Sequence, residues 1–399
     1  MKQRQKWKSF DFTLLITPLL LVCFGIVMIY SASMVVSIMD NKPSNYYMLR
    51  QLIWFGISLV GFAICCVIPY RHYQKIMKFI IFGLIGLLVA VLFVGIEAHG
   101  AKSWLLIGKF TLQPSEFVKL GLIMYLASIY SKKQNYITDF SKGVLPPLVI
   151  TGILLGLIGM QPDIGTGAIV FLIACSVIFS SGIKFKHLFL LVFVGIGLLG
   201  LAATQMVNDE RISRFTGAYQ PFEQPDDGGY QLIQSYVAIG TGGIVGEGLG
   251  SGVQKMGYLT QPHTDFIMAV VAEELGFVGV IIIIGMLAII VLRGIYIARI
   301  CEDSFGSLLA IGISSMVGIQ TFINLGAISG LLPITGVPLP FISYGGSSLL
   351  VSMISMGILN NIALNVKLKE QKVVTDPQID RPSVYTRSYQ SNEQNLWHK

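Results

Sequence analysis

Long apolar runs of about 20 residues recur along this 399-residue chain. A helix of that length spans the hydrocarbon core of a bilayer and satisfies its backbone polar groups internally. Only 12% of the residues are charged, about half the usual share of a soluble domain. The sequence therefore predicts an all-α integral membrane protein with a bundle of about ten transmembrane helices. The expected spans are 12–32, 51–69, 79–96, 115–131, 143–160, 164–182, 188–206, 266–292, 305–328 and 344–366.

The positive charges predict the orientation of these helices. If the N-terminus is inside, 20 of the 28 Lys and Arg residues fall on inner segments, 7 on outer loops and Lys119 within a span. The positive-inside rule then places both termini in the cytoplasm. The net charge of +7 reflects this topology, and its spread over many loops gives no reason to expect a nucleic-acid partner. The first apolar run is long for a signal peptide, so we expect an uncleaved first helix.

Two irregular stretches interrupt the spans. We expect a membrane domain over residues 1–366, with a large extracellular loop at 207–263 between helices 7 and 8, and a polar cytoplasmic tail at 367–399. Apolar residues among the glycines of the loop favour a folded lid over a flexible linker. The uncharged, Pro- and Gly-rich stretch 330–346 predicts backbone that lines a cavity at membrane depth. An ordinary turn between two helices is the alternative.

Several common kinds of site are missing from the sequence. Lys109 is followed by Phe110, so Gly108-Lys109 is no phosphate loop, and the glycines at 240–252 do not complete a dinucleotide fingerprint. We therefore expect no nucleotide, and a process that uses an already activated substrate or a gradient. His99 and His263 are too isolated for a zinc site. The cysteines have neither metal-site spacing nor an oxidising setting; they are Cys23, Cys65, Cys66, Cys175 and Cys301.

Charged residues within or beside the spans are the candidates for chemistry, because they are costly to bury. Glu116 and Lys119 lie three residues apart, on one face of a helix that is expected to start near Gln113-Pro114. They could form an ion pair that has a function or one that only orders the bundle. Asp265 ends the long outer loop where an apolar run begins. It could cap that helix, or it could act as a general base at the membrane's outer rim.

Other polar residues have more ordinary explanations. Glu273 and Glu274 lie deeper on the same helix and are expected to be supporting groups with partners. Gln320 and Asn324 are one turn apart and predict hydrogen bonds between helices. Asp163 stands where it could cap a helix. Basic and aromatic residues on the outer side could contact phosphates or sugars, or could be surface charge and an interface anchor; they are Lys102, Trp104, Lys109, Arg211 and Arg214.

Five segments together resemble one family, the SEDS proteins of bacterial shape, elongation, division and sporulation. The resemblance covers residues 10–366, and residues 27–33 and the extended tail are most similar to the division members; elongation and sporulation roles stay open. One departure is Thr260-Gln261-Pro262, where relatives often carry a Glu, so a role for that extra carboxylate is in doubt here. The five segments are 113–119 (QPSEFVK), 161–166 (QPDIGT), 263–267 (HTDFI), 273–276 (EELG) and 339–348 (LPFISYGGSS).

The resemblance implies a peptidoglycan glycosyltransferase that polymerises lipid II at the outer face of the cytoplasmic membrane, at the septum for a division member. It implies Asp265 as the essential carboxylate, Glu116 and Lys119 as an important membrane pair, and a divalent cation, Mg²⁺ or Mn²⁺, as activator. It also implies a class B penicillin-binding protein as transpeptidase partner. Further substrate-binding candidates are His263, Ser343, Tyr344 and Ser347. A lipid II flippase is the main alternative, and a scaffold that recruits an enzyme is a third.

Overall fold

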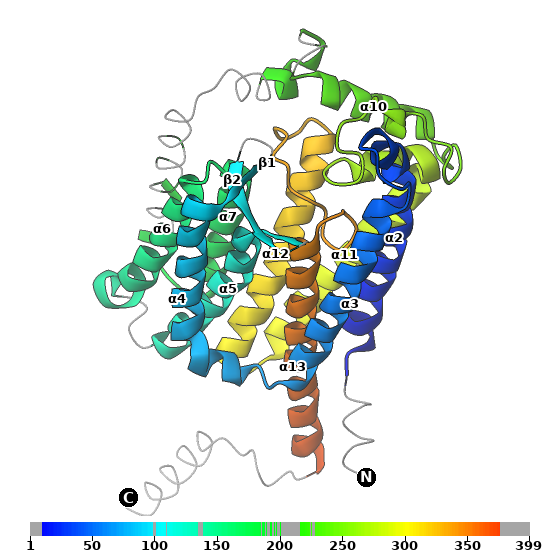
Figure 1. Ribbon diagram of the computed structural model, residues 1–399. Helices are drawn as coiled ribbons and strands as arrows, with labels where there is room; N and C mark the ends of the chain where they lie inside the picture. The colour runs from blue at the N-terminus through cyan, green and yellow to red at the C-terminus, as the bar shows by residue number, and fades with distance from the viewer. Residues whose placement is uncertain are drawn as a thin grey trace, which may run out of the picture.

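The computed structural model describes residues 10–98, 101–108, 110–134, 139–184, 216–223, 225 and 228–375, and single residues between 186 and 200 (186, 187, 189, 192, 193, 195, 197 and 200). Long helices stand side by side in a bundle (Figure 1). The helices of its first part are α2 (Phe12–Met39), α3 (Tyr46–Val67), α4 (Arg71–Val94), α5 (Pro114–Lys132), α6 (Leu145–Gly159) and α7 (Ile164–Ser180). A π-helical turn, η2 (Phe140–Val144), leads into α6.

The second part of the chain supplies the centre of the bundle. It contains the 3-10 turns η3 (Pro221–Glu223) and η4 (Gln254–Met256), and the helices α10 (Tyr230–Gly242), α11 (Ile267–Ile300), α12 (Ser304–Ile328) and α13 (Gly346–Thr375). α13 packs along α3, and α12 packs against α5, α7 and α11. α10 lies across one end of the bundle, where it packs on α11 (Figure 1).

Most predicted spans coincide with observed helices. Within the described residues, seven helices are long and apolar enough to cross a membrane, and α7, which coincides with the predicted span 164–182, is a shorter apolar helix. α5 coincides with the predicted span 115–131. The predicted span 188–206 falls almost wholly outside the described residues. The all-α membrane fold class is confirmed, whereas the number of ten crossings stays a prediction.

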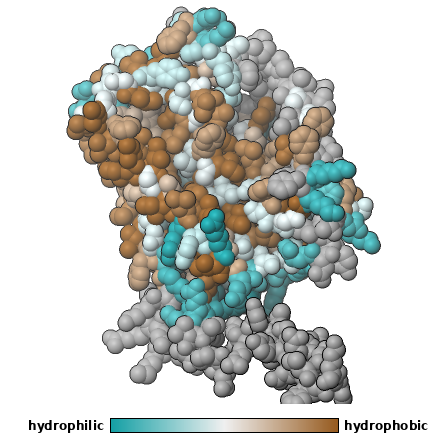
Figure 2. Space-filling view, turned by 180° about the vertical axis from the view of Figure 1, so that it is seen from behind, coloured by the Kyte–Doolittle hydropathy of each residue, from teal (hydrophilic) through white to brown (hydrophobic). Residues whose placement is uncertain are grey.

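The surface of the bundle is apolar as a membrane protein's must be. Phe79, Phe82 and Phe93 of α4 are 80%, 73% and 79% exposed, which would be costly in water. Hydrophobic residues cover most of the described height of the face in Figure 2, and hydrophilic ones gather at its lower end. These helices therefore face lipid.

One end of the bundle is tied together by charge. Asp11 caps α2 by accepting a hydrogen bond from Leu14 N–H, and its carboxylate contacts Arg293 of α11 at 2.7 Å and Lys367 of α13 at 3.5 Å. The start of α2 and the late part of α13 thus lie at the same end, as expected for termini on one side. The side of the membrane stays a prediction. α13 continues as far as Thr375, into the segment expected to be a polar tail.

A small antiparallel sheet, which the apolar pattern did not predict, lies between α4 and α5. Its strands are β1 (Ile96–Ala98), β2 (Ala101–Ile107) and β3 (Phe110–Leu112), in that order across the sheet. Trp104 pairs with Ile96, and Leu105 pairs with Leu112. Because β3 leads directly into α5, the sheet sets the position at which that helix begins.

Candidate active site

A cavity of about 370 Å³ opens at the end of the bundle opposite Asp11. Trp104 of β2 lines one side of it, and Pro333–Gly336 and Pro338 of the irregular stretch before α13 line another. The prediction that stretch 330–346 lines a cavity is therefore confirmed. This stretch carries no charged residue, so its contribution to the cavity lining is uncharged.

Four helices begin at this cavity. The residues that line it include Gln113 before α5, Asp163 before α7, Phe266 before α11 and Gly345 before α13. The N-terminal end of a helix presents unpaired amide groups and a partial positive charge, which suit anionic ligands. None of the described lining residues is Lys or Arg. Among the described lining residues, helix ends are therefore the groups that carry partial positive charge.

Asp265 lines the cavity just before α11. The helix begins at Ile267, and its N-cap residue is Phe266, whose side chain makes no capping hydrogen bond. The N-cap position that one of the two hypotheses gave to Asp265 is therefore taken by the next residue, Phe266. Its backbone is fixed from two sides, because Asn324 Nδ2 donates to the Asp265 carbonyl at 2.8 Å and Ser343 Oγ donates to the Thr264 carbonyl at 2.6 Å.

Asp163 is a second carboxylate of the cavity lining, and its side chain accepts hydrogen bonds that hold two helix starts together. It caps α7 by accepting from Thr166 N–H at 3.1 Å, as predicted, and it accepts from Gln113 Nε2 at 3.2 Å. Although its side chain is partly open to the cavity, burial raises the pKa of Asp163 against these hydrogen bonds. Asp163 thus links the starts of α5 and α7.

Glu116 and Lys119 form the predicted ion pair. Lys119 Nζ lies 2.7 Å from Glu116 Oε1, and both side chains are buried. Neither residue lines the cavity; the pair lies behind it, one turn along α5 from Gln113. The geometry confirms that the two side chains pair, and a role in function stays a prediction.

The other candidates divide into three groups. Trp104, Tyr344 and Ser347 line the cavity, and Ser347 Oγ also accepts from Gln113 N–H. Lys102 and His263 do not. Lys102 Nζ donates to the carbonyls of Leu92 and Phe93 near the end of α4, and the buried His263 ring packs between Tyr47 and Tyr344.

Ser343 is the third candidate that does not line the cavity, and its side chain forms hydrogen bonds with backbone groups. Its hydroxyl accepts from Leu339 N–H and donates to Thr264. It therefore joins the irregular stretch to the loop that carries Asp265. Arg211 and Arg214 lie outside the described residues, as do His99 and Lys109.

The segment that was expected to be the large outer loop is folded where it is described, as expected, whereas its role as a lid and its side of the membrane stay predictions. α10 packs on α11, and Gly242 comes so close to α11 that a Cβ there would lie 1.8 Å from the Ala272 carbonyl. The sequence did not reveal that Lys255, counted as an outer-loop charge, is buried and paired with Glu274. The sequence did show that Glu274 lies within an apolar run, and because a buried carboxylate is costly, this position indicated that Glu274 needs a partner.

Comparisons with known proteins agree with this arrangement. The model of the FtsW/RodA/SpoVE family, described as "Cell cycle protein", matches residues 12–368. The chain belongs to this family. It is 47% identical over 380 residues to the "Probable peptidoglycan glycosyltransferase FtsW" of Bacillus subtilis (strain 168), covering 93% of this chain and 94% of that protein. It is 41% identical over 362 residues to "Stage V sporulation protein E" of the same organism, covering 90% and 98%.

Solved structures of relatives share the fold of this family member. A structure from work on the structural coordination of polymerization and crosslinking by a peptidoglycan synthase complex matches with a TM-score of 0.74 at 27% identity, covering 90% of this chain and 98% of that one. The rod shape determining protein RodA of Thermus thermophilus matches with a TM-score of 0.65 at 26% identity, covering 90% and 97%. This chain is thus a multi-pass membrane protein of the FtsW/RodA/SpoVE family.

Proposed function

We propose that this protein is a peptidoglycan glycosyltransferase that polymerises lipid II at the outer face of the cytoplasmic membrane. The observation that carries the proposal is Asp265, a carboxylate that lines a cavity at which four helices begin, one residue before the N-cap position of α11. Relatives that carry the name peptidoglycan glycosyltransferase FtsW, matched over most of the chain, support the assignment.

The chemistry follows from the groups around the cavity. Asp265 takes the proton from a hydroxyl of the acceptor sugar, and the hydroxyl oxygen forms a bond to the anomeric carbon of the donor. The bond from that carbon to the pyrophosphate oxygen breaks, and undecaprenyl pyrophosphate leaves with the electron pair. Helix ends oriented toward the cavity stabilise the charge that grows on the leaving group. One base without a protein nucleophile gives inversion at the sugar.

A divalent cation belongs to this proposal. The described residues hold no group of three His, Cys, Asp or Glu side chains that could bind a metal alone. Mg²⁺ commonly needs only one or two carboxylates when a substrate phosphate completes its shell. Asp163 and Asp265 would hold such an ion together with the pyrophosphate, whose negative charge it would neutralise. Mn²⁺ binding followed by electron paramagnetic resonance should therefore depend on added pyrophosphate and be weakened by Asp163→Asn.

The biological setting that we propose is septal cell-wall synthesis with a class B penicillin-binding protein as transpeptidase partner. The higher identity to the FtsW relative (47%) than to the sporulation relative (41%) favours the division role. The match to a chain of a solved synthase complex supports a crosslinking partner. Depletion of the protein should give filaments with unfinished septa, whereas round cells would indicate an elongation role.

The test of the activity uses purified protein in detergent with lipid II, Mg²⁺ or Mn²⁺, and the partner, followed by a gel of glycan products. Detergent removes the two sides of the membrane, so polymer cannot arise from flipping. We expect glycan strands from the wild type and a loss of about 10²- to 10⁴-fold in Asp265→Asn. A wild type that makes no polymer, but moves lipid II across sealed vesicles, would establish the flippase instead.

A further inference from the structure

α11 is broken within its length, at Gly276. This residue has φ 66° and ψ −165°, far from helical values. In an unbroken helix the amides of residues 277 and 278 would donate to the carbonyls of residues 273 and 274. Here they cannot. The break therefore leaves two donors and two acceptors to be satisfied by other groups, at a depth where an unsatisfied backbone group is costly.

The segment 243–256, which we call the strap, satisfies all four of these groups. The amides of Phe277 and Val278 donate to the carbonyls of Gly243 and Ile244 at 3.0 and 3.2 Å. The carbonyls of Glu273 and Glu274 accept from the amides of Glu247 and Gly248, both at 3.0 Å. The strap thus supplies acceptors for the two amides and donors for the two carbonyls that the break leaves without helical partners.

Glycine makes this close approach possible. A Cβ on Gly276 would lie 2.4 Å from the Gly246 nitrogen and 2.5 Å from the Ile244 carbonyl oxygen. A Cβ on Gly246 would lie 2.3 Å from the Glu274 carbonyl oxygen. Both residues also have positive φ, which other residues rarely adopt. The strap and the broken part of α11 therefore pack closely only because both positions are glycine.

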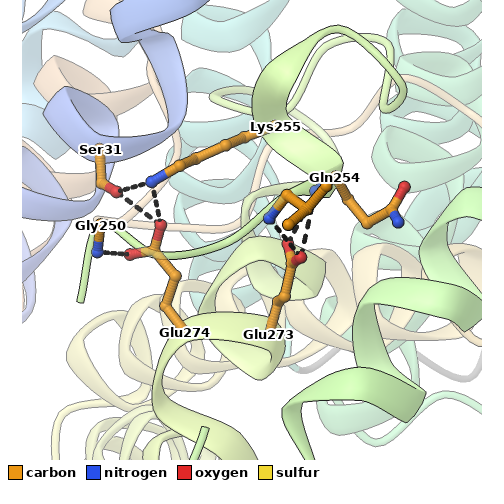
Figure 3. Close-up of polar contacts among 7 residues, drawn as sticks. Ser31, Gly250, Gln254, Lys255, Glu273 and Glu274 are labelled. Carbon is orange, nitrogen blue, oxygen red and sulfur yellow. Dashed lines mark hydrogen bonds and ion pairs between the residues drawn. The ribbon is translucent and has the colours of Figure 1, made fainter. Parts of the chain in front are cut away.

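Two buried carboxylates hold the strap to the N-terminal segment of α11, before the break (Figure 3). Glu274 pairs with Lys255 of the strap, and Ser31 of α2 bonds to both, at 2.6 Å to Glu274 and 2.8 Å to Lys255. Glu273 accepts from the amides of Val253 and Gln254. Lys255 and Glu274 are 1% and 0% exposed, so this contact is hardly screened by solvent.

The position of the strap depends on these polar contacts, because several of its apolar side chains are mostly exposed and so contribute little packing. Ile244, Val245 and Leu249 are 72%, 77% and 57% exposed. By contrast, the N-terminal segment of α11, Ile267–Leu275, is buried along most of its length. It is a short rod with Asp265 before one end and the Lys255 contact about 13 Å away near the other. The break at Gly276 separates this rod from the rest of α11.

From this geometry we infer that the strap positions the N-terminal segment of α11 through the Ser31–Lys255–Glu274 cluster, and so sets the place of Asp265 in the cavity. The inference rests on the proposed glycosyltransferase function. Lys255 and Glu274 are positioning residues: they act on the reaction through Asp265 and touch no substrate. A small misplacement of a reacting group can cost about 100-fold in rate.

The test compares two paired substitutions in the lipid II polymerisation assay. Lys255→Met with Glu274→Gln removes both buried charges and keeps the side-chain volumes close, which is often tolerated by a fold. The matched control is Asp11→Asn with Arg293→Gln, an ion pair at the opposite end of α11. We expect the first double variant to lose about 10- to 100-fold in kcat with KM within about twofold, and the control to keep kcat within about twofold.

A third variant covers the case in which the double variant does not fold. Ser31→Ala removes one hydroxyl and no charge, and we expect about a fivefold fall in kcat with unchanged KM. Wild-type kcat in a folded double variant or in Ser31→Ala would overturn the inference, as would an equal loss in the control. A wild type that makes no polymer would instead overturn the proposed function.

Discussion

Lys119 Nζ lies 2.7 Å from Glu116 Oε1, and the two side chains are 1% and 4% exposed. Two opposite charges are therefore buried together one turn inside α5, directly behind the cavity lining. Removing one partner of such a pair leaves the other charge uncompensated, whereas removing both is far less harmful. This asymmetry gives the pair a recognisable signature in mutants.

We expect Glu116→Gln and Lys119→Met each to cost about 3–5 kcal/mol of stability, and the two together to regain most of it. The unfolding midpoint of each purified variant in detergent, followed by intrinsic fluorescence, measures this. Single variants that unfold like the wild type would mean that the pair contributes nothing to the bundle.

Asp163 and Asp265 line the same cavity, but substitution by Asn should distinguish their roles. Asn keeps the capping oxygen that α7 needs, so Asp163→Asn should change the free energy of unfolding by less than about 1 kcal/mol. Its polymerisation rate should stay within about tenfold of the wild type, whereas Asp265→Asn should lose about 10²- to 10⁴-fold. Initial rates of glycan formation give the comparison. Equal losses in both variants would refute the assignment of Asp265 as the base.

Two glycines of α11 offer a matched pair. Gly276→Ala would place a methyl group against the strap backbone at a positive φ, whereas a Cβ on Gly285 meets nothing within 4 Å. We expect Gly276→Ala to lower the unfolding midpoint and polymerisation strongly, and Gly285→Ala to resemble the wild type. Thermal unfolding and the glycan gel check both. The prediction fails if the two alanine variants behave alike.

The pH dependence of stability should reveal the contribution of the Asp11 carboxylate to the folded state. Burial acts to raise the pKa of Asp11, but the hydrogen bond and charge of Arg293 and the charge of Lys367 leave it below the ordinary value of 3.8. A carboxyl whose pKa is lowered on folding stabilises the folded state fully above its ordinary pKa, and this is lost as pH falls toward the lowered value. The difference in unfolding midpoint between wild type and Asp11→Asn should be constant from about pH 5 to 8 and shrink below about pH 4. A difference that grows on acidification would contradict the assignment.

The sequence by itself determined the membrane fold, most of its helices and the kinds of residue at the site. Apolar runs of span length have few other solutions, and buried charges such as Glu116 and Lys119, three residues apart on one helix, pair for local reasons. The cap at Asp163 is local in the same way. Asp265 was identified as a candidate by its place where the long loop ends and an apolar run begins, with two roles open.

Only the tertiary structure decided what depends on contacts between distant segments. It placed Trp104, Tyr344 and Ser347 at the cavity and Lys102 away from it, and it put Phe266 in place of Asp265 at the N-cap position of α11. It also paired Lys255 with Glu274, 19 residues further on, and with Ser31, 224 residues away. Hydrophobic periodicity records which residues avoid water, but it cannot say which buried groups meet, because the packing of whole helices fixes those partners.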